Sequence, residues 1–65
     1  MMNYLNLETV LLTVNEVAKT LKTNSNTVYE LINRGDLKGL KLGRIKVPYF
    51  EVERFLRDNL GKEVI

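Results

Sequence analysis

The side chains that could take part in chemistry are mainly amides, hydroxyls and cations, in the segment between residues 24 and 48. The chain of 65 residues contains no histidine and no cysteine. It therefore lacks the usual ligands of structural zinc, a reactive thiolate and a histidine to activate a serine or threonine. Glu51 and Glu53 are two positions apart on an expected helix, so they cannot form a facing carboxylate pair. We expect no enzyme activity, no metal and no other cofactor.

Positive charge is concentrated in one stretch of the chain. Residues 34–46 contain five cations and one acid, a net charge of +4, whereas the whole chain carries +2 and the remainder therefore −2. A basic stripe on a nearly neutral body is typical of small proteins that bind nucleic acid. The simpler interpretation is a solvated charged loop. We expect candidate contacts to phosphates, which position a protein without reading sequence, from Lys22, Thr27, Arg34, Lys41, Arg44 and Lys46.

A polar helix face could read base edges. Within residues 25–34, four polar side chains lie opposite the apolar stripe, and we predict these as base-reading candidates: Ser25, Asn26, Tyr29 and Asn33. Asparagine can make two hydrogen bonds to adenine in the major groove, which makes Asn26 the first candidate. Its alternative interpretation is ordinary helix-start chemistry, and Tyr29 could instead lie half-buried against the following hairpin.

Two helices must position this polar face. Thr13 and Glu16 have the spacing of a capping box, which predicts a first helix at about residues 14–22. Asn24 is a favourable N-cap for a second helix over about 25–34, and Gly35 is suited to end it. Because only about three residues separate the helices, the pattern predicts a helix-turn-helix arrangement.

A hairpin must position the basic stripe. Residues 40–42 and 45–47 alternate apolar and basic side chains around Gly43-Arg44. A two-residue type II′ loop would place Lys41 opposite Lys46, with the apolar side chains together on the other face. Like charges in such a pair repel, and binding to phosphates would relieve the repulsion. The alternative role for these lysines is protection of a sheet edge against aggregation.

A third helix completes the expected core. Pro48 suits the first position of this helix, and the expected buried stripe is Val52, Phe55, Leu56 and Leu60. The apolar run at residues 10–12 is too short for a signal core or a membrane span. We therefore expect no membrane association, and a cytoplasmic protein that is associated with the nucleoid when bound to DNA.

The order and spacing of several short motifs resemble the excisionase-family helix-turn-helix domain, a small winged relative of the MerR DNA-binding domain. The resemblance covers residues 12 to about 57, and its marks are Leu12-Thr13 with Glu16, Ala18, Thr27-Val28-Tyr29, Leu31-Ile32, Arg34-Gly35-Asp36-Leu37, Gly43-Arg44, Pro48 and Phe55-Leu56. The resemblance implies groove contacts from Ser25, Asn26 and Tyr29, and contacts from a hairpin wing through Arg44 and Lys46. Two departures are Lys22, where the family usually has glycine, and a shorter wing with fewer arginines, which favours contact with the DNA backbone over insertion into the minor groove.

The expected fold is mainly α with a small β-hairpin, a three-helix winged helix-turn-helix. Residues 1–11 are expected to form an N-terminal arm or short strand, 12–60 the DNA-binding domain and 61–65 a flexible tail. The expected function is that of an excisionase, which binds double-stranded DNA, bends it and assists an integrase, with neighbouring copies on the DNA. The alternatives are a small transcriptional regulator of a mobile element, and a winged protein-interaction module that does not bind DNA. No small-molecule effector is expected.

Overall fold

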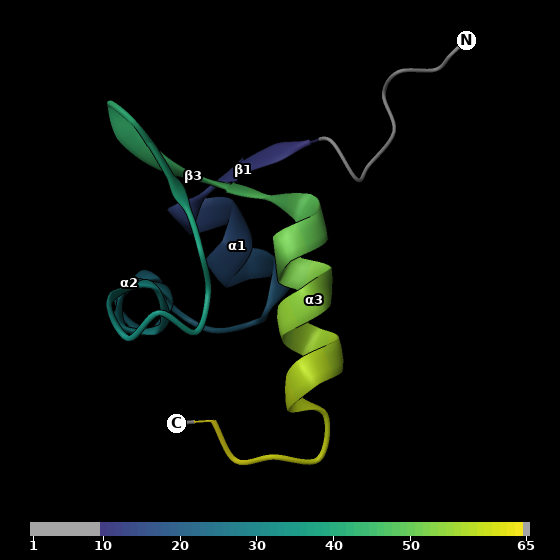
Figure 1. The fold of residues 1–65 in the computed structure, drawn as a ribbon. Helices are drawn as coiled ribbons and strands as arrows, with labels where there is room; N and C mark the ends of the chain where they lie inside the picture. Colours follow the sequence, from purple (N-terminus) through teal and green to yellow (C-terminus); the bar gives the residue numbers. More distant parts are fainter. Residues whose placement is uncertain (1–9, 65) are drawn as a thin grey trace, which may run out of the picture.

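Three helices and a three-stranded antiparallel sheet make up the described part of the chain, residues 10–64 of a computed structural model (Figure 1). The elements in chain order are β1 (Leu11–Thr13), α1 (Val14–Thr20), α2 (Ser25–Asn33), β2 (Leu40–Leu42), β3 (Arg44–Pro48) and α3 (Tyr49–Asn59). The central strand β3 pairs with β1 on one side and with β2 on the other. The winged helix-turn-helix fold predicted from the sequence is confirmed.

The first helix begins as its capping box predicts. The Thr13 amide donates to Glu16 Oε1 at 2.9 Å, and the Glu16 amide donates to Thr13 Oγ1 at 3.1 Å. The helix ends at Thr20, two residues before the predicted end. Lys22 then adopts a φ of +56°, and the Thr23 amide donates to the Ala18 carbonyl at 2.8 Å. A lysine therefore occupies the left-handed closing position that usually favours glycine.

The second helix also follows its local signals. Asn24 Oδ1 accepts a hydrogen bond from the Thr27 amide at 2.8 Å, so Asn24 is the N-cap. The helix ends at Asn33, with Arg34 as C-cap and Gly35 at a φ of +84°. The turn between α1 and α2 is short, as predicted, but it has four residues, 21–24, because α1 ends early. The two helices pack against each other.

The core lies between α1, α2, α3 and the inner face of the sheet. Its members are Val14, Val17, Ala18, Val28, Leu31, Leu37, Val47, Val52 and Phe55. The predicted stripe of α3 is right for Val52 and Phe55 and wrong for Leu56 and Leu60, which are 46% and 79% exposed. The buried residues of α3 are Glu51, Val52 and Phe55. They span about 100° of the helix at 3.6 residues per turn, and Leu56 and Leu60 lie outside that arc.

The hairpin register differs from the prediction by one residue. Leu42 pairs with Arg44, Lys41 with Ile45 and Leu40 with Lys46. The predicted facing pair of Lys41 and Lys46 is therefore wrong, and so is the repulsion inferred from it. Because a slip of one residue reverses the side-chain faces, Leu40 and Leu42 point outward with Arg44 and Lys46. Ile45 and Val47 point inward, and Lys41 shares their side of the hairpin.

Tertiary contacts explain this register. Val47 is fully buried and pairs with Leu12 of β1, which fixes the inner face of β3. Leu37, also fully buried, anchors the chain before β2. A Cβ atom on Gly39 would lie 2.9 Å from Ile45 Cγ2, so β2 enters the sheet closer to β3 than a side chain would permit. Gly43, at a φ of +74°, is then the single residue between the paired Leu42 and Arg44.

The two ends of the chain are described only in part. The predicted N-terminal arm or strand falls on residues 1–9, which lie outside the described residues, and on β1, which starts at Leu11. At the other end, the Val64 side chain packs against the core and its carbonyl accepts from Arg34 Nη2 at 3.2 Å. Residues 61–64, expected to belong to a flexible tail, thus return to the end of α2, and Ile65 is not described. No helix within residues 10–64 has the length and apolar character that crossing a membrane requires.

Candidate nucleic-acid interface

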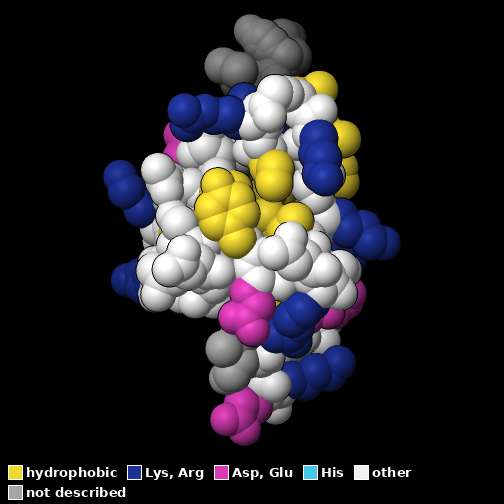
Figure 2. Space-filling model, turned by 90° about the vertical axis from the view of Figure 1, so that its left-hand side faces the viewer, with side chains coloured by type: hydrophobic (Ala, Val, Ile, Leu, Met, Phe, Trp, Pro, Cys, Tyr) yellow, Lys and Arg dark blue, Asp and Glu magenta, His cyan; other side chains and the backbone are white. Residues whose placement is uncertain are grey.

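A groove separates α2 from the hairpin. Its volume is about 320 Å³, and its lining comes from the start of α1, the middle of α2 and the hairpin tip: Thr13, Val14, Asn15, Tyr29, Gly43, Arg44 and Ile45. The hairpin tip and α2 lie on the same side of the molecule (Figure 1). Seen from that side, hydrophobic side chains form a central patch, with Lys and Arg side chains at several points around it (Figure 2). This face combines apolar contact surface with positive charge.

Tyr29 stands on the α2 side of the groove. Its side chain is 46% exposed, and it faces the hairpin residues Gly43 and Arg44 across the groove. Tyr29 is therefore exposed, and its ring is accessible to a molecule in the groove. A tyrosine so placed offers both an apolar face and a hydroxyl to a molecule in the groove.

The start of α2 is bonded to the start of α1. Ser25 Oγ donates to Asn15 Oδ1 at 2.5 Å, so the predicted base-reading candidate Ser25 has a partner within the protein. Asn15 itself lines the groove and is exposed, and it was not among the site residues predicted from the sequence. Its position in the first turn of α1 could have identified it as a site residue, because that turn lies beside α2 in a helix-turn-helix.

Asn26 and Asn33 project from the exposed side of α2, two helical turns apart. The cap of α2 is Asn24, so the alternative role of Asn26 as helix-start residue is already filled. Within residues 10–64, the side-chain amide of Asn26 forms no hydrogen bond, and it is available to a ligand. Thr27 is half-buried, and its backbone amide is used by the Asn24 cap.

The hairpin cations have no acidic partner among the residues that the structure describes. Lys41 and Arg44 are exposed, and Lys46 is half-buried between Leu40 and Thr13 on the outer face of the sheet. None of the three forms an ion pair within residues 10–64. Lys22, on the turn between α1 and α2, is also exposed and unpaired in that part of the chain. These cations retain their charge for an external anion.

Arg34 differs from the other predicted phosphate contacts. Its guanidinium lies 2.7 Å from Asp36 Oδ2 and 3.9 Å from Glu30 Oε2, and it also donates to the Val64 carbonyl. The structure therefore assigns Arg34 to the closure of α2 and keeps it apart from the groove residues. Its side chain is 43% exposed, but a phosphate would have to compete with two carboxylates.

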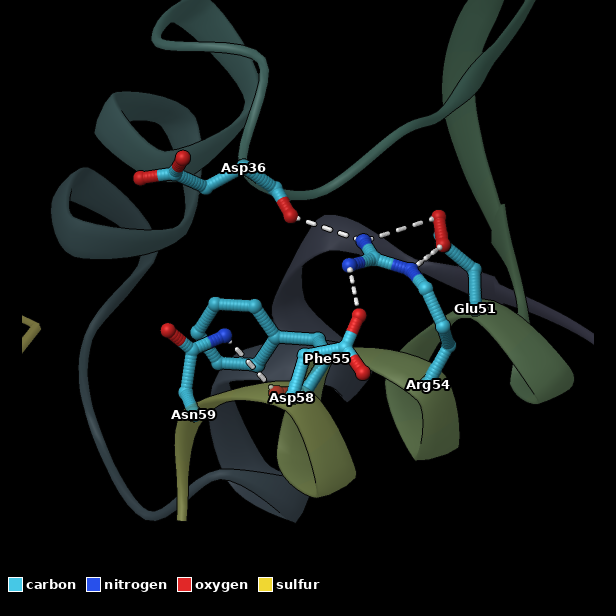
Figure 3. Close-up of polar contacts among 6 residues, drawn as sticks. All are labelled: Asp36, Glu51, Arg54, Phe55, Asp58 and Asn59. Carbon is cyan, nitrogen blue, oxygen red and sulfur yellow. Dashed lines mark hydrogen bonds and ion pairs between the residues drawn. The ribbon is translucent and has the colours of Figure 1, made fainter. Parts of the chain in front are cut away.

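A polar cluster behind the interface was missed by sequence reasoning. Arg54 Nε contacts Glu51 Oε2 at 2.6 Å, Nη1 contacts Asp58 Oδ2 at 3.1 Å and Nη2 donates to the Asp36 carbonyl at 2.8 Å (Figure 3). The hydrogen bonds to Glu51 and then to Asp58 raise the pKa of Arg54 above its ordinary value. Spacings of three and four residues on one helix were the signal for this network. The cluster ties α3 to the loop after α2 and so helps to hold α2 in place.

Comparison with known proteins supports the same class of domain. A family model described as a helix-turn-helix domain matches residues 11–60, which is most of the chain. No curated protein and no solved structure matches. The matched region begins at β1 and includes both helices of the motif, the hairpin and α3.

Proposed function

The chain belongs to the helix-turn-helix domain family, and we propose that it binds double-stranded DNA in a sequence-directed manner through α2 and the hairpin. The observation that carries this proposal is the groove between them. It is lined by Tyr29 on one side and Arg44 on the other, and the hairpin cations beside it have no ion-pair partner in the described part of the chain. An anionic polymer supplies the partner that these cations need.

The geometry suits a duplex with α2 in the major groove. In that orientation Asn26, Tyr29 and Asn33 face base edges, and asparagine favours adenine. One DNA strand would pass through the groove, its phosphates near Arg44 and the start of α1. Lys41 and Lys46 would contact neighbouring phosphates, which orient the protein without reading sequence.

The proposed role is that of an excisionase, an accessory factor that bends DNA and directs an integrase toward excision. It rests on the resemblance of residues 12 to about 57 to that family. Bending a site costs several kcal/mol, and contacts from neighbouring copies and from an integrase would offset this cost. Small transcriptional regulators could use the same surface, so DNA binding alone does not distinguish the two roles.

Selection of bound sequences from a random duplex pool, followed by anisotropy titration at two salt concentrations, tests DNA binding. We expect one enriched sequence and an affinity that falls as salt rises. Undetectable binding to any duplex at low salt would contradict the proposal and favour a protein-interaction module. Lys46→Ala should weaken binding to all sequences and flatten the salt dependence.

The purpose of binding requires a second experiment. A recombination assay should pair the protein with an integrase whose attachment region contains the selected sequence. We expect excision to depend on the protein. If the selected sequence instead overlaps a promoter, and excision is the same with and without the protein, the regulator role replaces the excisionase role.

A further inference from the structure

The hairpin turns two leucines toward solvent. Leu40 is 46% exposed and Leu42 is 58% exposed, although the hairpin has an inner face that buries Val47 completely. In the register predicted from the sequence both leucines would have faced inward. The observed register pairs Leu42 with Arg44 and Leu40 with Lys46, so a leucine lies beside a cation at each pair.

Leu42, at the tip of the hairpin, is the more exposed of the two leucines. Leu42 immediately precedes Gly43, and Gly43 and Arg44 line the mouth of the groove beside α2. In Figure 1 the tip projects away from the helices on the side that α2 occupies. No acidic residue occurs between Leu37 and Phe50. The tip therefore presents an apolar side chain within an entirely basic element.

This combination matches the chemistry of the DNA minor groove. The minor groove has a negative potential that attracts arginine and lysine, and apolar side chains can enter it and separate stacked base pairs. The short wing by itself favours contact with the DNA backbone, but a tip that bound only phosphates would gain nothing from the exposed Leu42. An acidic protein partner would satisfy the cations, and that occupant is an outcome of the test below.

We propose that Leu42 is an apolar wedge, which enters a base-pair step in the minor groove next to the major groove occupied by α2. Arg44 and Lys46 would hold the tip against the two phosphate strands. Pyrimidine–purine steps are the easiest to unstack, so the protein should favour TA or CA at that position without a hydrogen bond to the bases. This inference rests on the proposed DNA binding and assigns the origin of the bend to one residue.

The test uses the full chain and the selected duplex, with 2-aminopurine placed in turn at each position flanking the α2 site. Separation of a step raises 2-aminopurine fluorescence, and dyes at the duplex ends report the bend. We expect the wild-type protein to raise the fluorescence at one pyrimidine–purine step and to shorten the distance between the ends. Leu42→Ser should abolish both effects and weaken binding by roughly five- to tenfold, and Leu42→Met should retain them.

Leu40→Ser is the matched control, because Leu40 is exposed on the same face of the same strand. We expect it to bind and bend DNA as the wild type does. Tight binding by the wild type with unchanged fluorescence at every position would overturn the wedge and leave the proposed function intact, as would equal effects of the two serine variants. Absence of binding to any duplex would overturn the proposed function itself.

Discussion

Two groups of arginines and lysines in this small domain differ in their partners. On α3 and at the end of α2, Arg54 and Arg34 are each bonded to two carboxylates and a backbone carbonyl. On the hairpin, Lys41, Arg44 and Lys46 have no acidic partner within residues 10–64. The first group fixes one segment of the protein to another. The second is left with charge that an external anion can neutralise.

The comparison shows that a cation's role follows from its neighbours more than from its place in a basic stretch. Arg34 belongs to the basic segment 34–46 by sequence and to the structural group by contacts. Net charge by segment cannot separate the two cases, because it does not show that Asp36 and Glu30 lie against the Arg34 guanidinium. The following substitutions test whether the two groups are separable.

Of these substitutions, Arg54→Ala should have the largest effect, which is a loss of folding stability. The substitution leaves the buried Glu51 carboxylate without its partner and frees the Asp36 carbonyl. We expect the free energy of unfolding to fall by about 2–3 kcal/mol, less than for a fully buried pair because Arg54 is partly exposed. Urea denaturation followed by circular dichroism measures it. A double variant that also carries Glu51→Gln should recover part of the loss, whereas no recovery would show that the ion pair is not its cause.

Asn26→Ala should have the next largest effect, and on specificity. If Asn26 makes a bidentate contact with adenine, its loss should reduce discrimination at one base pair by about 1–3 kcal/mol. The measurement is a set of competition titrations with single-base variants of the selected site. Asn33→Ala, two turns along the same face, is the matched comparison for which base pair is read. An unchanged preference would remove Asn26 from the candidates, and the stability of both variants should stay near that of the wild type.

Arg44→Ala tests the hairpin group directly. Because Arg44 is exposed and forms no ion pair with another described residue, we expect the free energy of unfolding to change by less than about 0.5 kcal/mol. Binding should weaken on all sequences, and the slope of log affinity against log salt should decrease by about 0.9 for the lost phosphate contact. Arg57→Ala is the matched control on α3, where another exposed arginine lies outside the groove lining. Equal salt slopes for the two variants would contradict the assignment of the hairpin to phosphate contact.

The sequence predicted those parts of the fold that local chemistry decides. Thr13 with Glu16, Asn24 and Gly35 each act within one helical turn, and each was placed correctly. The hairpin register depends on contacts with residues far along the chain, such as Leu12 of β1, and it was predicted one residue away from the observed pairing. In α3, Glu51 is buried because it is paired with Arg54. Hydrophobic periodicity considers only apolar side chains, so it could not predict this buried residue.

The candidate site divides in the same way. Tyr29 and Arg44 were identified from residue type and position, and the structure brings both to one groove. Asn15 was not predicted, because the pattern of α1 does not show that its first turn contacts the start of α2. Arg34 was included because a charge count does not show that Asp36 and Glu30 lie against its guanidinium. Residue types are thus sufficient to nominate a site, but the partners that remove or add a residue depend on the tertiary structure.

Substitutions of Lys22 should have the smallest effects, and they test whether this lysine belongs with the structural cations or with the cations that contact DNA. Its left-handed backbone costs roughly 1 kcal/mol in a residue with a side chain, and its charge is exposed and unpaired within the described residues. Lys22→Gly should therefore raise the free energy of unfolding by about 0.5–1 kcal/mol, as measured by urea denaturation. Lys22→Asn removes the same charge but keeps a side chain, so it should stabilise less.

The salt dependence of DNA binding then decides how the charge of Lys22 is used. If Lys22 contacts a phosphate, both variants should lower the salt slope by about 0.9, although one of them stabilises the fold. If the salt slope is unchanged in both variants, Lys22 neither contacts DNA nor stabilises the fold, and glycine is the more stable residue for this turn. A stabilised variant with weaker binding would show that stability and phosphate contact conflict at this position, whereas at Arg44 they are independent.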